Sequence, residues 1–185
     1  MRLDRPALEV APELLGAVLT VDGVSVRLTE VEAYEGEDDP ASHAWRGPTP
    51  RNAVMYGPAG RLYVYLSYGI HSCVNLVCDV EGRASAVLLR AGEVVAGEER
   101  VRVRRGHVPQ RRLASGPGNV GSALGLTAAD SGLVLDGVRA SLVSGSPGEV
   151  SSGPRVGVSR AADVPWRFWL AGDPTVSTYL RSPRA

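Results

Sequence analysis

Apolar and polar positions alternate most clearly between residues 18 and 36. Val18–Val21 and Val24–Tyr34 have the composition of strands, and Asp22-Gly23 between them is typical of a tight hairpin turn. Successive side chains on a strand point to opposite faces. The second strand is therefore predicted to place on one face Val24, Val26, Leu28, Glu30, Glu32 and Tyr34.

An apolar stripe that runs into two carboxylates and an aromatic ring is atypical of a solvated surface. It is typical of the wall of a cleft that is built on a core. A plainer interpretation stays open at this point: one glutamate pairs with an arginine, or the strand simply leaves the core at Glu30.

The rest of the chain alternates between short strands, short helices and turns. A polar, turn-rich loop is predicted for residues 35–52, and ordered loops of this length often have a function. Residues 92 to about 105 are predicted to be helical, because acidic residues come early and arginines late. The other predicted elements are a short helix at 11–16, a turn at 55–60, strands at 61–69, 70–79 and 84–90, a Gly-rich turn and short helix at 115–126, a turn at 136–137, a surface loop at 144–154, and strands at 155–158 and 166–170.

Length and composition bound the fold. With 185 residues, 44% of them hydrophobic, the chain suits one domain with a real core, and 22 Gly and 13 Pro predict many turns. No apolar run reaches the ~18 residues of a membrane span, and the N-terminus lacks the apolar region of a signal peptide. The spacing of Cys73 and Cys78 argues against a disulfide framework and against a zinc site. We therefore expect a cytosolic protein with no membrane partner.

Charge narrows the chemistry further. The net charge is zero, from 20 basic and 20 acidic residues, which is weak evidence against a nucleic-acid partner. Every basic residue is Arg and none is Lys, which excludes Schiff-base lysines, Walker A lysines and Ser–Lys dyads. The strongest charge run, residues 100–112, holds six Arg and one His. A solvated helix end and a phosphate-facing patch are both open interpretations of that run.

The predicted strand at 61–69 is rich in tyrosine, in a chain with only 5% aromatic residues. Tyr63 and Tyr65 share a face, whereas Tyr68 precedes Gly69 at the strand end, where a tight turn can project a ring. Rings near Arg can hold flat bases and cationic heterocycles, but Tyr is also an ordinary strand former. We favour the ordinary role for Tyr63 and a functional one for Tyr68.

Several catalytic classes lack their motifs. GxSxG, HExxH and GK[ST] are all absent, which argues against an esterase-type elbow, a metalloenzyme and a phosphate loop. His43, in the 35–52 loop, is either exposed and idle or a hydrogen-bonding or stacking member of a site. What remains is carboxylate chemistry with aromatic and Arg support. It suits hydrolysis through an oxocarbenium-like sugar transition state, in which a carboxylate activates water.

Five blocks of the sequence carry a resemblance that runs from about Pro6 to Ser177. They are LTEVEAYEG, DPASHAWRGPTPRNAVMYGPAGRLYVYLSYGIHSCVN, ASAVLLRA, LASGPGNVGSALGL and PRVGVSRA. In these blocks, their order and their spacing, the chain resembles the alkyladenine (3-methyladenine) DNA glycosylase family. The resemblance implies a base-excision repair enzyme that flips out and hydrolytically removes alkylated or deaminated purines, of the 3-methyladenine, hypoxanthine and ethenoadenine type, leaving an abasic site. Its partner would be double-stranded DNA containing damaged purines.

The resemblance also implies which residues carry the chemistry. Glu32 would be the general base that deprotonates the attacking water. Arg90 and the backbone of Val156 would help to hold that water. Because the chain has no Lys to attack the sugar, we expect a monofunctional glycosylase, with no metal and no cofactor.

The same resemblance implies a base pocket and a wedge. Tyr34, His43 and Tyr65 would line the pocket and sandwich the extruded base, and the backbone amide of His43 would read its edge. Asn75 would crowd the purine C2 position and so disfavour the exocyclic amine of guanine. Tyr68 would enter the minor groove and fill the gap left by the flipped nucleotide.

Two positions depart from the family pattern. His71 stands where relatives often have an aromatic residue, which puts the support of the wedge hairpin in doubt. Asn119 stands where the SGPG block is often followed by Lys, which removes one expected phosphate contact.

We expect an α+β fold: a single domain over residues 1–185, with a curved, largely antiparallel sheet flanked by short helices. The protein should act as a monomer, since reading one lesion needs no two-fold symmetry, in the cytoplasm and at the nucleoid if the source is bacterial. Two alternatives stay open. One is a glycoside hydrolase that uses Glu30 and Glu32, whose Cα spacing of roughly 6.5–7 Å suits a two-carboxylate mechanism. The other is a catalytically inactive nucleic-acid-binding domain.

Overall fold

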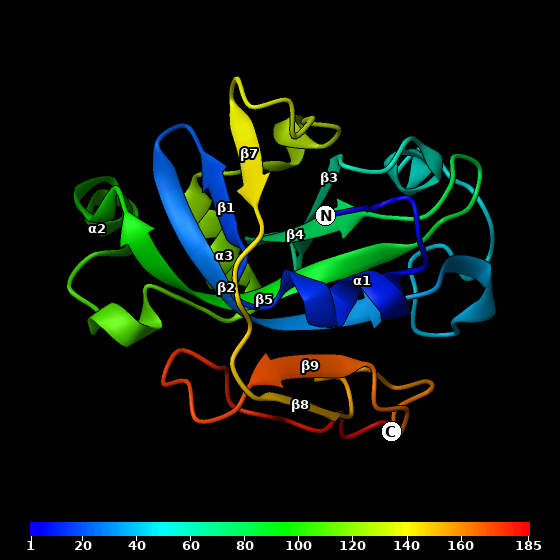
Figure 1. Cartoon of the computed structure of the whole chain (residues 1–185). Coiled ribbons are helices and arrows are strands. Elements are labelled where there is room, and N and C mark those ends of the chain that lie inside the picture. The colour runs from blue at the N-terminus through cyan, green and yellow to red at the C-terminus, as the bar shows by residue number, and fades with distance from the viewer.

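Two long antiparallel strands, β2 (Val24–Tyr34) and β5 (Ala86–Ala96), form the centre of the protein. The computed structural model describes residues 1–185 and contains a nine-stranded sheet in the order β3-β4-β5-β2-β1-β7 (Figure 1). The other three of the nine strands lie outside this order: β6 pairs with β5, and β9 pairs with both β2 and β8. The bounds of the other strands are β1 Val18–Val21, β3 Leu62–Ser67, β4 His71–Val77, β6 Ala114–Ser115, β7 Ala140–Val143, β8 Val150–Gly153 and β9 Arg167–Leu170.

Strand β2 changes partner halfway along its length. Its first residues pair with β1, whereas Glu30–Glu32 pair with β9, so the β8–β9 hairpin lies below the main sheet in Figure 1. At the same place the register between β2 and β5 shifts on either side of Glu30, which leaves Thr29 and Arg90 without Cα partners. Such bulges bend a strand and redirect its side chains. Here they occur where the strand carries its two carboxylates.

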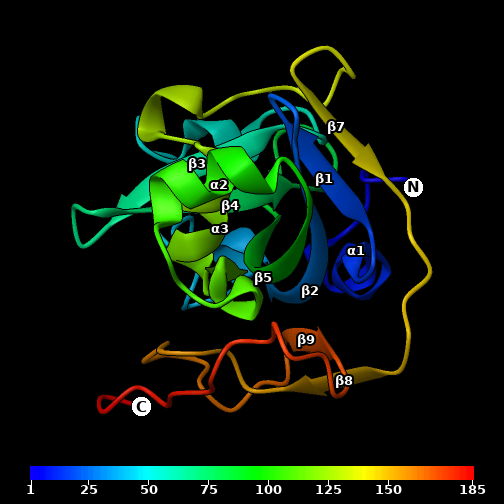
Figure 2. The ribbon, with the colours of Figure 1, turned by 90° about the vertical axis from the view of Figure 1, so that its left-hand side faces the viewer.

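Three α-helices and four short 3-10 helices cover the sheet. Figure 2 shows α1 and α3 on opposite sides of the β2–β5 pair, and both contact these strands. The main core is a cluster of 29 buried hydrophobic residues. No helix has the length and apolar run needed to cross a bilayer. The bounds of the helices are α1 Ala7–Leu14, α2 Glu98–Arg105, α3 Pro117–Leu124, η1 Gly36–Asp38, η2 Ala53–Tyr56, η3 Gln110–Arg112 and η4 Ala128–Asp130.

The predicted fold class is confirmed: an α+β fold with a curved antiparallel sheet and short helices. The β1–β2 hairpin is also confirmed, with φ of 47° at Asp22 and 77° at Gly23. Both values are left-handed, as the tightest hairpin turns require. Helix α3 ends where it was predicted to end, at Gly125, which adopts φ of 71°.

Two predicted helices have the wrong bounds, and one predicted strand is absent. Residues 92–96 continue β5 instead of starting a helix, and α2 begins only after Gly97, because pairing with β2 outweighs the charge pattern. The first helix starts at Ala7, since Ser85 Oγ and Glu35 Oε1 accept hydrogen bonds from its first amides. Residues 155–158 form no strand, and β8 lies earlier, inside the predicted surface loop.

Helix α3 packs unusually closely on β4. A Cβ added to Gly121 would lie 2.0 Å from the carbonyl oxygen of Ser72, and one added to Gly118 would lie 2.8 Å from the Cβ of His71. The His71 side chain therefore packs against α3 at Gly118. The two glycines set the position of the β3–β4 hairpin.

We predict that Gly121→Ala lowers the free energy of unfolding by about 1–3 kcal/mol, because the added methyl group has no space against the β4 backbone. Urea unfolding measures the change. Gly148→Ala is the control, since nothing lies within 4 Å of its Cβ position. Equal stability of the two variants would contradict the close packing of α3 on β4.

Candidate active site

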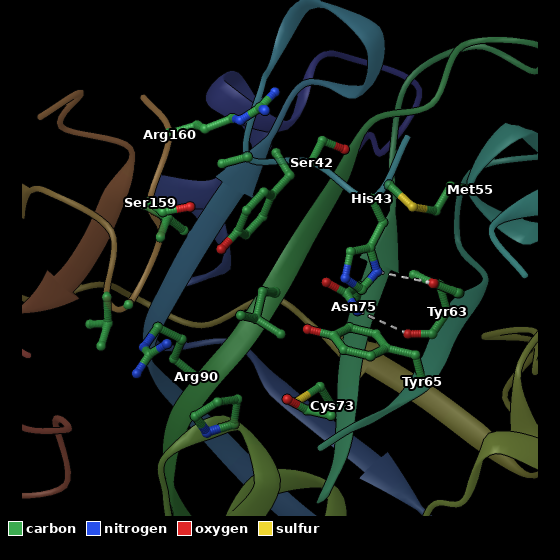
Figure 3. Close-up of a pocket in the computed structure, with 18 of the residues that line it drawn as sticks. Ser42, His43, Met55, Tyr63, Tyr65, Cys73, Asn75, Arg90, Ser159 and Arg160 are labelled. Carbon is green, nitrogen blue, oxygen red and sulfur yellow. Dashed lines mark hydrogen bonds between the residues drawn. The ribbon is translucent and has the colours of Figure 1, made fainter. Parts of the chain in front are cut away.

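One cavity of about 520 Å³ opens between the β3–β4 hairpin, the 39–43 turn and the 156–160 loop (Figure 3). In Figure 3, Arg90 and Ser159 lie on one side of it, and His43, Asn75 and Tyr65 lie on the other. Seven of the eight predicted site residues line this cavity, and the eighth, Glu32, lies directly beneath it. The seven are Tyr34, His43, Tyr65, Tyr68, Asn75, Arg90 and Val156.

Glu32 is fully buried on β2, but three residues of the cavity wall hold its carboxylate. The backbone N–H of Val156 donates to Oε1 at 2.7 Å, and the Tyr34 hydroxyl donates to Oε2 at 2.9 Å. Arg90 Nη1 lies 3.5 Å from Oε1. Burial raises the pKa of Glu32 above its ordinary 4.5, although Arg90 and the two hydrogen bonds act in the opposite direction. A carboxylate with a raised pKa is a stronger base, as general-base catalysis requires.

Arg90 is held from the side away from the cavity. Its Nε donates to Glu30 Oε1 at 3.1 Å, and its Nη2 donates to Ser177 Oγ at 3.3 Å. The backbone N–H of Ser177 in turn donates to Glu30 Oε2 at 2.7 Å. Glu30 is therefore an arginine partner, as the plainer interpretation of the strand proposed. The guanidinium lies between the two carboxylates and faces Glu32 from a fixed position.

Aromatic rings form the opposite wall. The His43 and Tyr65 ring centroids are 4.4 Å apart, and His43 Nδ1 lies 3.2 Å from the Tyr63 hydroxyl. Burial, together with Arg51, lowers the pKa of His43, so its imidazole is neutral at pH 7. Asn75 Nδ2 donates to the Tyr63 carbonyl at 3.1 Å, which fixes the orientation of the amide. Tyr63 is a structural residue, as favoured above, and it also holds two of the wall residues.

The turn between β3 and β4 presents apolar side chains to solvent. Tyr68 is 93% exposed with φ of 50°, and Ile70 is 74% exposed. A left-handed backbone is uncommon for a residue other than Gly and directs the ring away from the hairpin. Figure 2 shows this hairpin projecting from the body of the protein. An exposed ring at the tip of a protruding hairpin has the shape of a wedge.

Most of the arginine run at 100–112 has local partners. Arg100 donates to the Asp22 carbonyl, Arg104 to the Ala123 carbonyl and Arg105 to the Leu113 carbonyl, while Arg102 pairs with Glu98. None of the run lines the cavity. These guanidinium groups hold the β1–β2 turn, the end of α3 and the segment after α2 in place. The sequence alone did not predict this role.

The sequence interpretation missed Asp39 and Arg155, which form a fully buried ion pair beside the cavity. Both lie inside blocks quoted above, Asp39 in DPASH and Arg155 in PRVGV. The available signal was a charged residue inside each block, with Arg155 directly before Val156 and Asp39 four residues before His43. Ser177, which completes the support of Arg90, lay at the end of the resemblance and had no such signal.

The arrangement favours one kind of chemistry. A buried, hydrogen-bonded carboxylate lies beside a pocket of aromatic rings, and no cluster of three or more His, Cys, Asp or Glu residues could hold a metal ion. Glu30 is bound by Arg90 and Ser177 and does not line the cavity, which argues against a two-carboxylate glycoside hydrolase. One buried carboxylate beside a pocket walled by aromatic rings suits the hydrolysis of a bond to a planar ring.

Comparison with known proteins agrees with this chemistry. A model of the family described as methylpurine-DNA glycosylase (MPG) matches residues 1–174. A protein of Cutibacterium acnes is 56% identical over 184 residues, which covers 95% of this chain and 96% of the relative. A protein of Corynebacterium efficiens is 54% identical, covering 97% of this chain and 95% of the relative. Both relatives bear the name "Putative 3-methyladenine DNA glycosylase".

Proposed function

The chain belongs to the methylpurine-DNA glycosylase family, and on that premise we propose that it removes 3-methyladenine, hypoxanthine and ethenoadenine from duplex DNA with Glu32 as its general base. At the level of the family it is a monofunctional DNA glycosylase of DNA repair, a hydrolase whose substrate is DNA. The observation that carries the proposal is the fully buried Glu32 carboxylate, held by Val156, Tyr34 and Arg90 against the aromatic cavity.

The proposed reaction is hydrolysis of the bond between the base and the sugar. A water bound between Arg90 and Val156 attacks C1′, Glu32 accepts its proton, and the base leaves with the bonding electron pair. The Val156 N–H is already used by Glu32, so the carbonyl oxygen of Val156 is the backbone group that accepts a hydrogen bond from the water. Ionised Glu32 also offsets the positive charge that develops on the sugar.

The pocket walls hold the extruded base. Tyr34 on one side and His43 with Tyr65 on the other are proposed to sandwich it, because electron-rich rings attract alkylated purines that carry positive charge. A neutral His43 favours this, since an imidazolium would repel a cationic base. Asn75, fixed by its bond to the Tyr63 carbonyl, is proposed to crowd the purine C2 position and to exclude the amine of guanine.

Tyr68 is proposed to open the duplex. A base inside the helix cannot be reached without flipping, which costs a few kcal/mol and costs less at damaged or mispaired sites. The ring of Tyr68, 93% exposed at the hairpin tip, fills the vacated space and offsets part of that cost. Because the ring makes few contacts in the free protein, it can enter DNA without breaking any interaction of the fold.

We predict that Glu32→Gln lowers the single-turnover excision rate at least a hundredfold, about the contribution of a general base. Duplexes with one 3-methyladenine, hypoxanthine or ethenoadenine, treated with alkali after incubation, measure the rate and the lesion range. Glu149→Gln, in an exposed loop, is the control. Unchanged excision by Glu32→Gln would remove Glu32 as the base, and lesions left intact by the wild type would be struck from the substrate range.

We predict that Tyr68→Ala abolishes base flipping and slows excision at least about tenfold, while unfolding stays unchanged because the ring has no packing partners. Fluorescence of a 2-aminopurine next to the lesion reports flipping. Val138→Ala, which trims an equally exposed side chain elsewhere, is the matched control. Wild-type flipping and excision in Tyr68→Ala would refute the wedge.

A further inference from the structure

Asp39 and Arg155 form an ion pair without solvent exposure between two loops of the active-site region. Arg155 Nη2 donates to Asp39 Oδ1 at 2.8 Å, while Nη1 donates both to Asp39 Oδ2 and, at 2.9 Å, to the Ala33 carbonyl. The guanidinium therefore joins β2, the loop after it and the loop after β8. A buried ion pair contributes little net stability compared with apolar side chains of similar size. Stability alone thus gives no reason for charges at this place.

The flat faces of the Arg155 guanidinium are also occupied. Its central carbon lies 4.5 Å from the centroid of the Tyr34 ring and 5.0 Å from that of Trp166. Contacts of this kind hold a ring in place and place positive charge next to it. Tyr34 can therefore not turn without losing its contact with Arg155.

Both neutral donors to the Glu32 carboxylate depend on this pair. Val156, which donates to Oε1, is the residue after Arg155, and Tyr34, which donates to Oε2, packs on the Arg155 guanidinium. Asp39 also shapes the turn that leads to His43, because its Oδ1 accepts from the Ala41 N–H and its carbonyl accepts from the Ser42 N–H. One ion pair thus fixes two hydrogen-bond donors to the Glu32 carboxylate and one wall of the pocket.

We propose that the Asp39–Arg155 pair is a positioning element, which aligns Val156 and Tyr34 on Glu32 and keeps the carboxylate ionised for catalysis. The proposal rests on the proposed function, in which Glu32 is the general base. It assigns no contact with DNA to either residue. Arg155 acts through its neighbours.

The pH dependence of excision reflects every charged or titratable group near Glu32. Those groups come from β2, β3, β4, β5, β9, the loop after β2 and the loop after β8. They are Glu30, Tyr34, Asp39, Tyr65, Cys73, Arg90, Arg155 and Arg167. Replacing the Asp39–Arg155 pair removes one charge of each sign and leaves Arg90 and Arg167 in place, so its effect on Glu32 comes mainly through the hydrogen bonds from Val156 and Tyr34, which favour the ionised carboxylate.

The test replaces the pair by apolar side chains of similar size, in Asp39→Leu/Arg155→Met, which leaves no unpaired buried charge. Single-turnover excision with saturating lesion DNA is measured from pH 4.5 to 8, together with the dissociation constant for the DNA. We expect an excision rate about tenfold to a hundredfold lower with little change in DNA affinity. We also expect the acidic limb of the pH profile to move to higher pH by about half a unit to one unit, since the hydrogen bonds from Val156 and Tyr34 that favour ionised Glu32 are no longer held in line.

Two further variants make the result decisive. Asp163→Asn/Arg181→Gln removes an exposed ion pair with an N–O distance of 2.7 Å and should leave rate and pH profile unchanged. Arg155→Lys, which keeps both charges of the pair but not the planar fork, should lower the rate and move the acidic limb in the same direction by less than the apolar variant does. It also serves as the test if the apolar double variant does not fold.

A wild-type rate and acidic limb in the folded apolar variant would overturn the positioning role. A lower rate with an unmoved acidic limb would overturn the claim that the pair keeps the Glu32 carboxylate ionised. Failure of the proposed function is distinguished by Glu32→Gln: if that variant excises normally, Glu32 is not the base. If Glu32→Gln is inactive and the apolar variant is normal, only the inference about the ion pair fails.

Discussion

The structure depends on the burial of charge at one point of β2. Glu30 and Glu32 have no solvent exposure, and each buried ion costs several kcal/mol unless it is paired and hydrogen-bonded. Arg90 lies between them at a register shift of β5, and the Val156 and Ser177 amides complete the coordination. The β8–β9 hairpin and the C-terminal segment are therefore part of the site, because each supplies an amide donor to one of these carboxylates.

This constraint also separates the roles of the two carboxylates. Glu30 is bound by an arginine and an amide on the side away from the cavity, and it has no access to a substrate. Glu32 is bound by Val156, Tyr34 and Arg90, which themselves line the cavity. Under the proposed mechanism, the fold provides one general base, Glu32, with a raised pKa, and one arginine held in place beside it. The Tyr68 hairpin and the aromatic walls bring the damaged purine to this pair.

Features set by neighbouring residues could be predicted from the sequence, whereas features set by tertiary contacts could not. The β1–β2 hairpin follows from Asp22-Gly23 and the end of α3 from Gly125, since each needs only a left-handed residue at a turn. The extension of β5 to Ala96 depends on pairing with β2, so the charge pattern of residues 92–105 predicted the helix correctly but placed its start too early. Glu32 could be singled out over Glu30 only through the family resemblance. Arg155 was missed because its role comes from Asp39, which is 116 residues away in sequence.

The central claim is that ionised Glu32 accepts the proton of the attacking water, and the pH dependence of excision by the wild-type enzyme tests it most directly. The substrate should carry one cationic alkylated purine, which needs no protonation to leave. Because burial raises the pKa of Glu32 above 4.5, the single-turnover rate should fall as the pH drops through that raised pKa, with an inflection clearly above 4.5. A rate that stays constant down to pH 4.5 would contradict the assignment of Glu32 as the base.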